Sequence, residues 1–237
     1  MKTIYFYISV IGLFAKLLLL SPDAQAQVNL KSISVGASYW KPSLNYWNER
    51  SILTAYNGGQ GATLGGQIMP NAALEIGLVK GFSVGVRAGY WKSSAASNLS
   101  IAGINRTEKL TLSIIPVSVD VRYSFDSKSA STETKTPFVS PYIGVGLSRY
   151  FIKNEFSRVV SGNTGSVNES EAGNNYGVQV FVGAERKLVK KLYVALDVRY
   201  HVGSYNQQVQ GETTSTTEKV SLNGLEAGLA LRVKFAN

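Results

Sequence analysis

The stretch LEAGLALRVKF (residues 225–235) decides the fold class. Its odd-numbered positions are all apolar, while Glu226, Arg232 and Lys234 fall on the even-numbered face. Successive side chains of a β-strand point to opposite faces, so this alternation predicts a strand with one apolar face and one polar face. The run also has the length of a tilted strand that crosses a bilayer, which needs roughly 9–11 residues.

The same period of two recurs earlier in the chain, at residues 33–39, 64–78, 82–90, 115–125, 141–151, 178–184 and 194–202. Eight such segments predict an all-β fold, a closed antiparallel up-and-down transmembrane β-barrel of about eight strands. Two prolines disturb the pattern. Pro116 lacks the amide proton of a strand ladder, so we expect a bulge or local break there, and Pro70 is expected to split the second segment or mark a bulge.

The connections between these segments alternate in length. Polar stretches rich in Ser, Thr, Asn and Gly occupy residues 41–61, 92–109, 153–175 and 203–219. Between them lie short turns near residues 80–81 and 189–191 and a longer one at residues 126–137. Long loops on one side and short turns on the other are typical of outer-membrane barrels. Aromatic residues at both ends of the strands predict two interfacial girdles, with pairs such as Tyr39-Trp40, Tyr90-Trp91 and Tyr150-Phe151 beside the long loops.

The first 26 residues read as a cleavable signal peptide. Lys2 supplies a positive start, an apolar stretch follows, and Ala24-Gln25-Ala26 has the small-x-small pattern of a cleavage site. A retained membrane helix would need roughly 20 uninterrupted apolar residues, and Lys16 interrupts the stretch. The expected organisation is therefore a signal peptide at residues 1–26 and an outer-membrane barrel domain at residues 27–237.

Composition narrows the class further. Charged residues make up 16 %, aromatic residues make up 11 %, and the formal net charge is +9. The basic residues are scattered, which disfavours a nucleic-acid partner and fits contact with outer-membrane lipid. The chain has no cysteine and one histidine, so we expect no disulfide framework, no metal site and no cofactor.

Energetics decide which face meets lipid. An Arg or Lys at mid-membrane on the lipid face costs roughly 2–4 kcal/mol, so the polar faces are expected to turn inward. A lumen of about eight strands is only wide enough to be filled by side chains. We therefore expect an ion-paired plug; a soluble lipocalin-like barrel would have the reverse arrangement. The five acids and five bases of this predicted network are Glu75, Arg87, Asp120, Arg122, Glu185, Asp197, Arg199, Glu226, Arg232 and Lys234.

These segments resemble the small eight-stranded outer-membrane barrels of the OmpA/OmpX/OmpW type and the opacity-porin-like families, from Val28 to Phe235. The last strand is similar to the terminal assembly signal of these families, with Gly228, Leu231, Val233 and Phe235 as its pattern. The resemblance implies that this strand engages the outer-membrane assembly machinery. Residues 236–237 extend beyond the final aromatic, where many family members end.

Some barrels of this size are lipid-modifying enzymes built on a Ser-His pair with an acid. Here His201 is followed by Ser204, and Glu226 lies on the next strand, but alternation puts Ser204 on the opposite face from His201. His201 is expected to be a hydrogen-bonded lumen residue, and no catalytic residue is assigned. Asp197 and Arg232 are expected to face each other across the last hairpin.

The sequence favours a non-enzymatic outer-membrane protein that contributes to envelope integrity or surface interaction through four long external loops. A ligand of those loops is unknown; Trp40, Trp47 and Trp91 are either contact residues for it or interfacial anchors. The alternatives are a porin or transport barrel for small or hydrophobic solutes, with a wall gap at Pro116 or Pro70, and a lipid-modifying hydrolase.

Overall fold

The computed structural model describes residues 29–50, 62–78, 81–101, 104–125, 139–162, 166–210 and 215–235. The expected signal peptide therefore lies outside the described residues. The elements are β1 (Asn29–Pro42), α2 (Asn45–Arg50), β2 (Gln67–Gly77), β3 (Phe82–Gly89), β4 (Trp91–Ile101), β5 (Ile104–Ser124), β6 (Ser140–Val160), β7 (Val167–Val189), β8 (Leu192–Gln210), β9 (Ser215–Ser221) and β10 (Gly224–Lys234). None of the helical segments in these ranges is long and apolar enough to cross a membrane.

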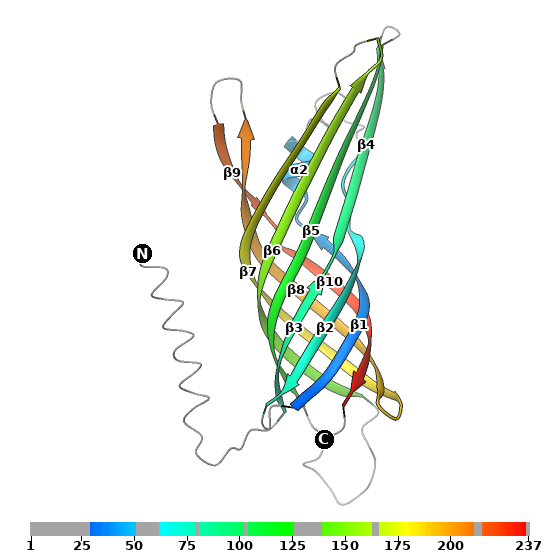
Figure 1. Ribbon diagram of the computed structural model, residues 1–237, viewed down its shortest axis with the longest axis vertical. Coiled ribbons are helices and arrows are strands. Elements are labelled where there is room, and N and C mark those ends of the chain that lie inside the picture. The colour runs from blue at the N-terminus through cyan, green and yellow to red at the C-terminus, as the bar shows by residue number, and fades with distance from the viewer. Residues whose placement is uncertain are drawn as a thin grey trace, which may run out of the picture.

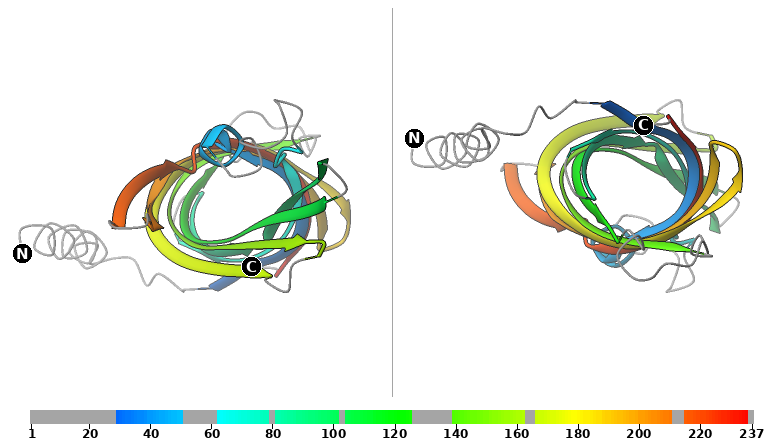
Figure 2. Two further views of the ribbon diagram at one scale, coloured as in Figure 1. Left: turned by 90° about the horizontal axis from the view of Figure 1, so that it is seen from above. Right: turned by 90° about the horizontal axis from the view of Figure 1, so that it is seen from below.

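The strands close into a ring. All pairings are antiparallel, and β10 pairs with both β1 and β8, so the ring runs β1-β2-β3-β5-β6-β7-β8-β10. Figure 2 shows this closed outline from both ends. The eight-stranded up-and-down barrel expected from the sequence is confirmed. We call the end where β1 begins and β10 ends the lower end (Figure 1).

The pairing of the strands changes above the middle of the ring. β4 continues the line of β3 and pairs with β5, while β9 precedes β10 and pairs with the upper part of β8. The β7–β8 ladder stops at the pair Gly177–Gly203. Above that pair, β4 to β7 form one curved sheet and β8 and β9 form a separate hairpin (Figure 1).

The two prolines, Pro116 and Pro70, disturb the pairing of their strands less than expected. β5 pairs with β6 through Pro116 opposite Tyr150 without a register shift. The local break lies on the other side of β5, where β3 ends and β4 begins in unchanged register. The missing amide of Pro116 therefore faces this interruption. β2 is neither split nor bulged at Pro70, whose carbonyl accepts a 3.1 Å hydrogen bond from the Tyr90 amide.

The prediction of long loops is wrong for most of these stretches, which are strands in the structure. Residues 92–109 lie largely in β4 and β5, residues 153–175 largely in β6 and β7, and residues 203–219 largely in β8 and β9. Within residues 41–61, the helix α2 occupies Asn45–Arg50, and residues 51–61 lie outside the described part. An antiparallel sheet accepts polar side chains on a face that meets water, so the abundance of Ser, Thr and Asn did not distinguish loop from strand.

The lower part has an apolar exterior. On β5 the side chains of Ile115 and Val119 are exposed, as is Phe125 directly after the strand, whereas Asp120 and Arg122 on the alternate face are buried. The same outward apolar belt runs around the ring, with Val35, Leu74, Val86, Val145, Val180, Leu196 and Leu229 among its exposed members. Exposed aromatic residues border the belt at Tyr39, Tyr90, Phe151, Tyr176 and Tyr200 above and at Phe82, Phe125 and Phe235 below. This is the surface of a transmembrane barrel with two aromatic girdles.

The upper part reverses this polarity. On β5 the side chains of Leu110, Leu112 and Ile114 are buried inside, and Lys109 points outward. Residues 104–114 continue this strand beyond the belt for roughly 35 Å of strand length, at about 3.3 Å per residue. An apolar interior with a polar exterior is the arrangement of a water-soluble β-structure, so the strands leave the membrane at the level of Ile115.

Candidate functional site

The interior of the lower part contains the charged residues. Of the ten expected there, eight are buried, and Asp197 and Lys234 are partly buried. Their positions follow from strand alternation, because each shares a face with the neighbouring inward side chains of its strand.

Glu185 is the centre of the lowest cluster. Its carboxylate accepts hydrogen bonds from Arg232 at 2.6 Å and Arg122 at 3.0 Å, and it is also paired with Lys234. Glu75 lies beside it, 3.1 Å from Arg122 and 3.0 Å from Lys31. Two carboxylates thus hold four cations, and each buried charge has a partner of opposite sign.

The middle of the interior is built around Asp120. Its carboxylate accepts hydrogen bonds from Arg199 at 2.8 Å and from Gln179 at 2.6 Å. Asp197 accepts a 2.6 Å hydrogen bond from the Tyr142 hydroxyl. The expected pairing of Asp197 with Arg232 is wrong, because the register of β8 and β10 places Asp197 opposite Gly228.

The upper border of the charged zone is a chain of hydrogen bonds. Arg87 is paired with Glu226, and the Nε2 atom of His201 lies 2.7 Å from Glu226 Oε2. The Nδ1 atom of His201 lies 2.9 Å from the Tyr150 hydroxyl. His201 is fully buried, and both ring nitrogens have partners.

This geometry does not resemble a hydrolase site. A serine nucleophile needs a base within hydrogen-bond reach. Ser204 follows the outward face of β8, while His201 contacts Tyr150 and Glu226 on the inside. The described residues contain no cluster of three or more His, Asp or Glu that could hold a metal ion.

Inward aromatic rings fill the space between the charges. The Arg122 guanidinium lies 3.6 Å from the centre of the Tyr142 ring, and that of Arg199 lies 4.1 Å from the centre of the Phe181 ring. Tyr142 therefore belongs to the interior and not to the girdle. A Cβ atom at Gly183 would overlap the Tyr142 ring, so glycine is needed there. The cavity left in this zone measures about 40 Å³, room for only a few water molecules.

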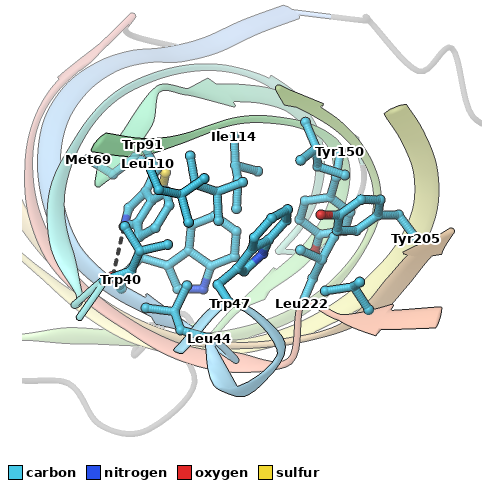
Figure 3. Close-up of a cluster of buried hydrophobic side chains, with 14 of the residues drawn as sticks. Trp40, Leu44, Trp47, Met69, Trp91, Leu110, Ile114, Tyr150, Tyr205 and Leu222 are labelled. Atoms are coloured by element: carbon cyan, nitrogen blue, oxygen red, sulfur yellow. Dashed lines mark hydrogen bonds between the residues drawn. The ribbon is translucent and has the colours of Figure 1, made fainter. Parts of the chain in front are cut away.

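An apolar core adjoins the upper border of the charged zone, where the rings of Trp40 and Tyr150 contact that of His201. Figure 3 shows the side chains of this core. Trp40 and Trp91 are fully buried, their rings meet edge to face at 6.0 Å, and the Trp91 indole donates a 3.0 Å hydrogen bond to the Trp40 carbonyl. Trp47 reaches into the ring from α2. The core consists of Trp40, Leu44, Trp47, Leu64, Met69, Trp91, Ala95, Leu110, Leu112, Ile114, Tyr150, Ile152, Tyr205, Val220 and Leu222.

The tryptophans were misplaced by sequence reasoning: none is a loop contact residue or a membrane anchor. The missed signal is the tripeptide Tyr-Trp-Lys, which occurs at residues 39–41 and 90–92. In each copy the tyrosine and the lysine are exposed and the tryptophan is buried. Period-two alternation requires that only one residue of an aromatic pair faces lipid.

The expected assembly strand is β10, which closes the ring. Leu231, Val233 and Phe235 are exposed on the apolar belt, and Gly228 packs closely against Ser38 of β1. Engagement of this strand by the assembly machinery remains a prediction.

No family model matches the chain, and no curated protein matches its sequence. Among solved structures, Neisserial surface protein A is 14 % identical, with 86 % of this chain and 96 % of that chain covered and a TM-score of 0.48. AlkL, an outer membrane protein solved in lipid bilayers, is 14 % identical, with 91 % and 95 % covered and a TM-score of 0.47. A major outer membrane protein from Thermus thermophilus is 14 % identical, with 87 % and 100 % covered and a TM-score of 0.47. The ring closure and the apolar belt of the chain itself carry the conclusion that it is an outer-membrane β-barrel.

Proposed function

We propose that this chain is a non-enzymatic outer-membrane barrel with a sealed interior, whose upper part acts at the cell surface in envelope integrity or surface interaction. The observation that supports it most is the filling of the interior by two successive zones. The lower zone is an ion-paired network with only a small cavity, and the upper zone is an apolar core. A hydrated ion or a sugar has no path through either zone.

The upper part supplies the surface for such a role. β4 to β7 extend beyond the membrane belt as a folded sheet with its own apolar core, so a partner would meet a rigid scaffold. A preformed surface loses less conformational entropy on binding than flexible loops do.

Reconstitution in planar bilayers and in dye-loaded liposomes tests the seal. We expect neither single-channel steps nor dye leakage. Steady conductance from the folded protein would contradict a sealed interior.

A deletion strain tests the surface role. We expect loss of the protein to raise sensitivity to bile-salt detergent or to reduce adherence of the cells to coated surfaces, with restoration by the full chain. If neither property changes, the surface role is wrong even where the seal holds.

A second candidate function is a lateral route for apolar solutes. It is favoured by the separation of β7 and β8 above Gly177 and Gly203, next to Tyr205 and Leu222 of the apolar core. A disulfide introduced across this separation, in a chain that has no other cysteine, would abolish uptake of a fluorescent apolar probe by whole cells. Equal uptake with the disulfide oxidised and reduced would exclude the route.

A further inference from the structure

The hairpin between β7 and β8 carries an unusual sequence at the lower end of the barrel. Residues 186–191 read Arg-Lys-Leu-Val-Lys-Lys, and all six side chains are exposed. The β6–β7 ladder ends at Ser140 opposite Glu185, so this tip continues past the neighbouring strand. The turn is completed by Lys190, which has a φ of 33°.

The tip is amphipathic and adjoins the membrane belt. Leu188 and Val189 are 50 % and 63 % exposed, although both are large aliphatic residues. β8 and β10 pair beside the tip at Leu192 and Val233, near the lower aromatic border. Aliphatic side chains between cations suit the boundary between acyl chains and headgroups.

Charge differs sharply between the two ends. In the ranges that the structure describes, the exposed acidic residues Glu49, Glu155 and Glu169 all belong to the upper part. At the lower end the carboxylates of Glu75 and Glu185 point inward and are already paired.

The three lysines of the tip differ from Lys31 and Lys234, which pair with these carboxylates. Among the described residues, none of the ion pairs involves Lys187, Lys190 or Lys191. The exposed surface of the lower end therefore attracts anions, and no acidic side chain in the described ranges neutralises it.

We propose that this basic hairpin binds the phosphate headgroups of anionic glycerophospholipids in the leaflet at the lower end of the barrel. Each cation near an anionic membrane surface strengthens binding by roughly fivefold. The exposed leucine and valine hold the tip at headgroup depth, where the lysines reach the phosphates. This binding is independent of whether the interior is sealed.

The test places a fluorophore at the tip. Because the chain has no cysteine, Val189→Cys gives a single labelling site. The labelled protein is reconstituted in phosphatidylcholine vesicles that contain spin-labelled phosphatidylglycerol or spin-labelled phosphatidylcholine. We expect stronger quenching by phosphatidylglycerol, with a preference of roughly tenfold or more.

Two triple variants decide which charges matter. Lys187→Gln, Lys190→Gln and Lys191→Gln together should bring the preference close to one. The matched control, Lys41→Gln, Lys92→Gln and Lys153→Gln, removes three exposed cations from the upper part and should leave it unchanged. Heat-modifiability on gels verifies that each variant is folded.

Three outcomes would overturn the proposal. They are no lipid preference in the labelled parent, a preference that survives in the tip variant, and an equal loss in the control. Binding of the parent to purified peptidoglycan through the same three lysines, without a lipid preference, would assign the tip to an acidic cell-wall ligand instead.

Discussion

The lower and upper parts of this barrel are built from the same strands with opposite chemistry. On β6, Val145 and Leu147 point outward and Ser148 inward in the lower part, while Lys153 points outward and Ile152 inward in the upper part. Strand alternation is unbroken between them, so geometry cannot be the cause. The cause is the solvent, because lipid surrounds the lower part and water surrounds the upper part.

The two interiors are consequently held together by different forces. The lower interior depends on pairing of buried charges, which stabilises only while every partner is present. The upper interior depends on burial of apolar area and on packing. A substitution that breaks a buried charge pair should therefore leave the upper part intact, and one that removes apolar burial should leave the lower part intact.

The largest effect is expected for Glu185→Ala in the lower part. The change leaves Arg122, Arg232 and Lys234 without their shared carboxylate, and breaking a buried ion pair costs about 3–5 kcal/mol. Urea unfolding in lipid vesicles, followed by tryptophan fluorescence, measures this loss in the free energy of unfolding. Glu155→Ala on the exposed upper surface is the control and should change the free energy of unfolding little.

Leu112→Ala should destabilise the upper part by about 2–5 kcal/mol, because Leu112 is 1 % exposed and its loss leaves a cavity. Val119→Ala on the same strand is the comparison. Its side chain faces lipid, which is as apolar as the protein, so little should be lost. Equal losses for the two variants would contradict our placement of the membrane.

Adding a charge to the outer wall of the barrel tests directly where the membrane ends. Val145→Arg places a cation on the lipid face and should cost about 2–4 kcal/mol. Ser157→Arg on the upper part of β6 should change stability by less than about 0.5 kcal/mol. Similar costs at both positions, in the same unfolding assay, would mean that the upper part is also immersed.

The smallest effect concerns the exposed pair Lys153 and Glu155, whose atoms are 2.6 Å apart. The hydrogen bond and the charge of Lys153 lower the pKa of Glu155 from 4.5. A lowered pKa adds stability above the unfolded value that is lost as pH falls through the folded value. The difference between the parent and Lys153→Gln should thus be detectable at neutral pH and vanish once the pH falls below the lowered pKa of Glu155; a difference that persists in stronger acid would contradict this origin.

The sequence predicted the lower part well because lipid imposes a strict rule on it. Outward positions at the middle of the membrane must be apolar, so the alternation in segments such as residues 225–235 was unambiguous. The cost of a charge in lipid then determined which face is the interior. The ten inward charges followed from this rule alone.

The upper part was misread because water imposes no comparable rule. Its outward faces carry Ser, Thr, Asn and Lys, which are also the residues of loops, so β4 and β9 were not recognised. The buried Trp40 and Trp91 were assigned to the girdle because a dipeptide does not show which of its members faces out. The repeat Tyr-Trp-Lys, with lysine on the same face as tyrosine, was the available clue.

By itself the sequence determined the eight strands of the ring, the two faces of each strand and the inward direction of the charges, because these depend only on the period of the chain and on the cost of charge in lipid. Only the tertiary structure decided which acid meets which base, since pairing depends on register: Asp197 lies opposite Gly228, and Arg232 contacts Glu185 instead. It also decided where the membrane ends, because that level becomes visible only when all strands are aligned side by side and their polarity reverses together.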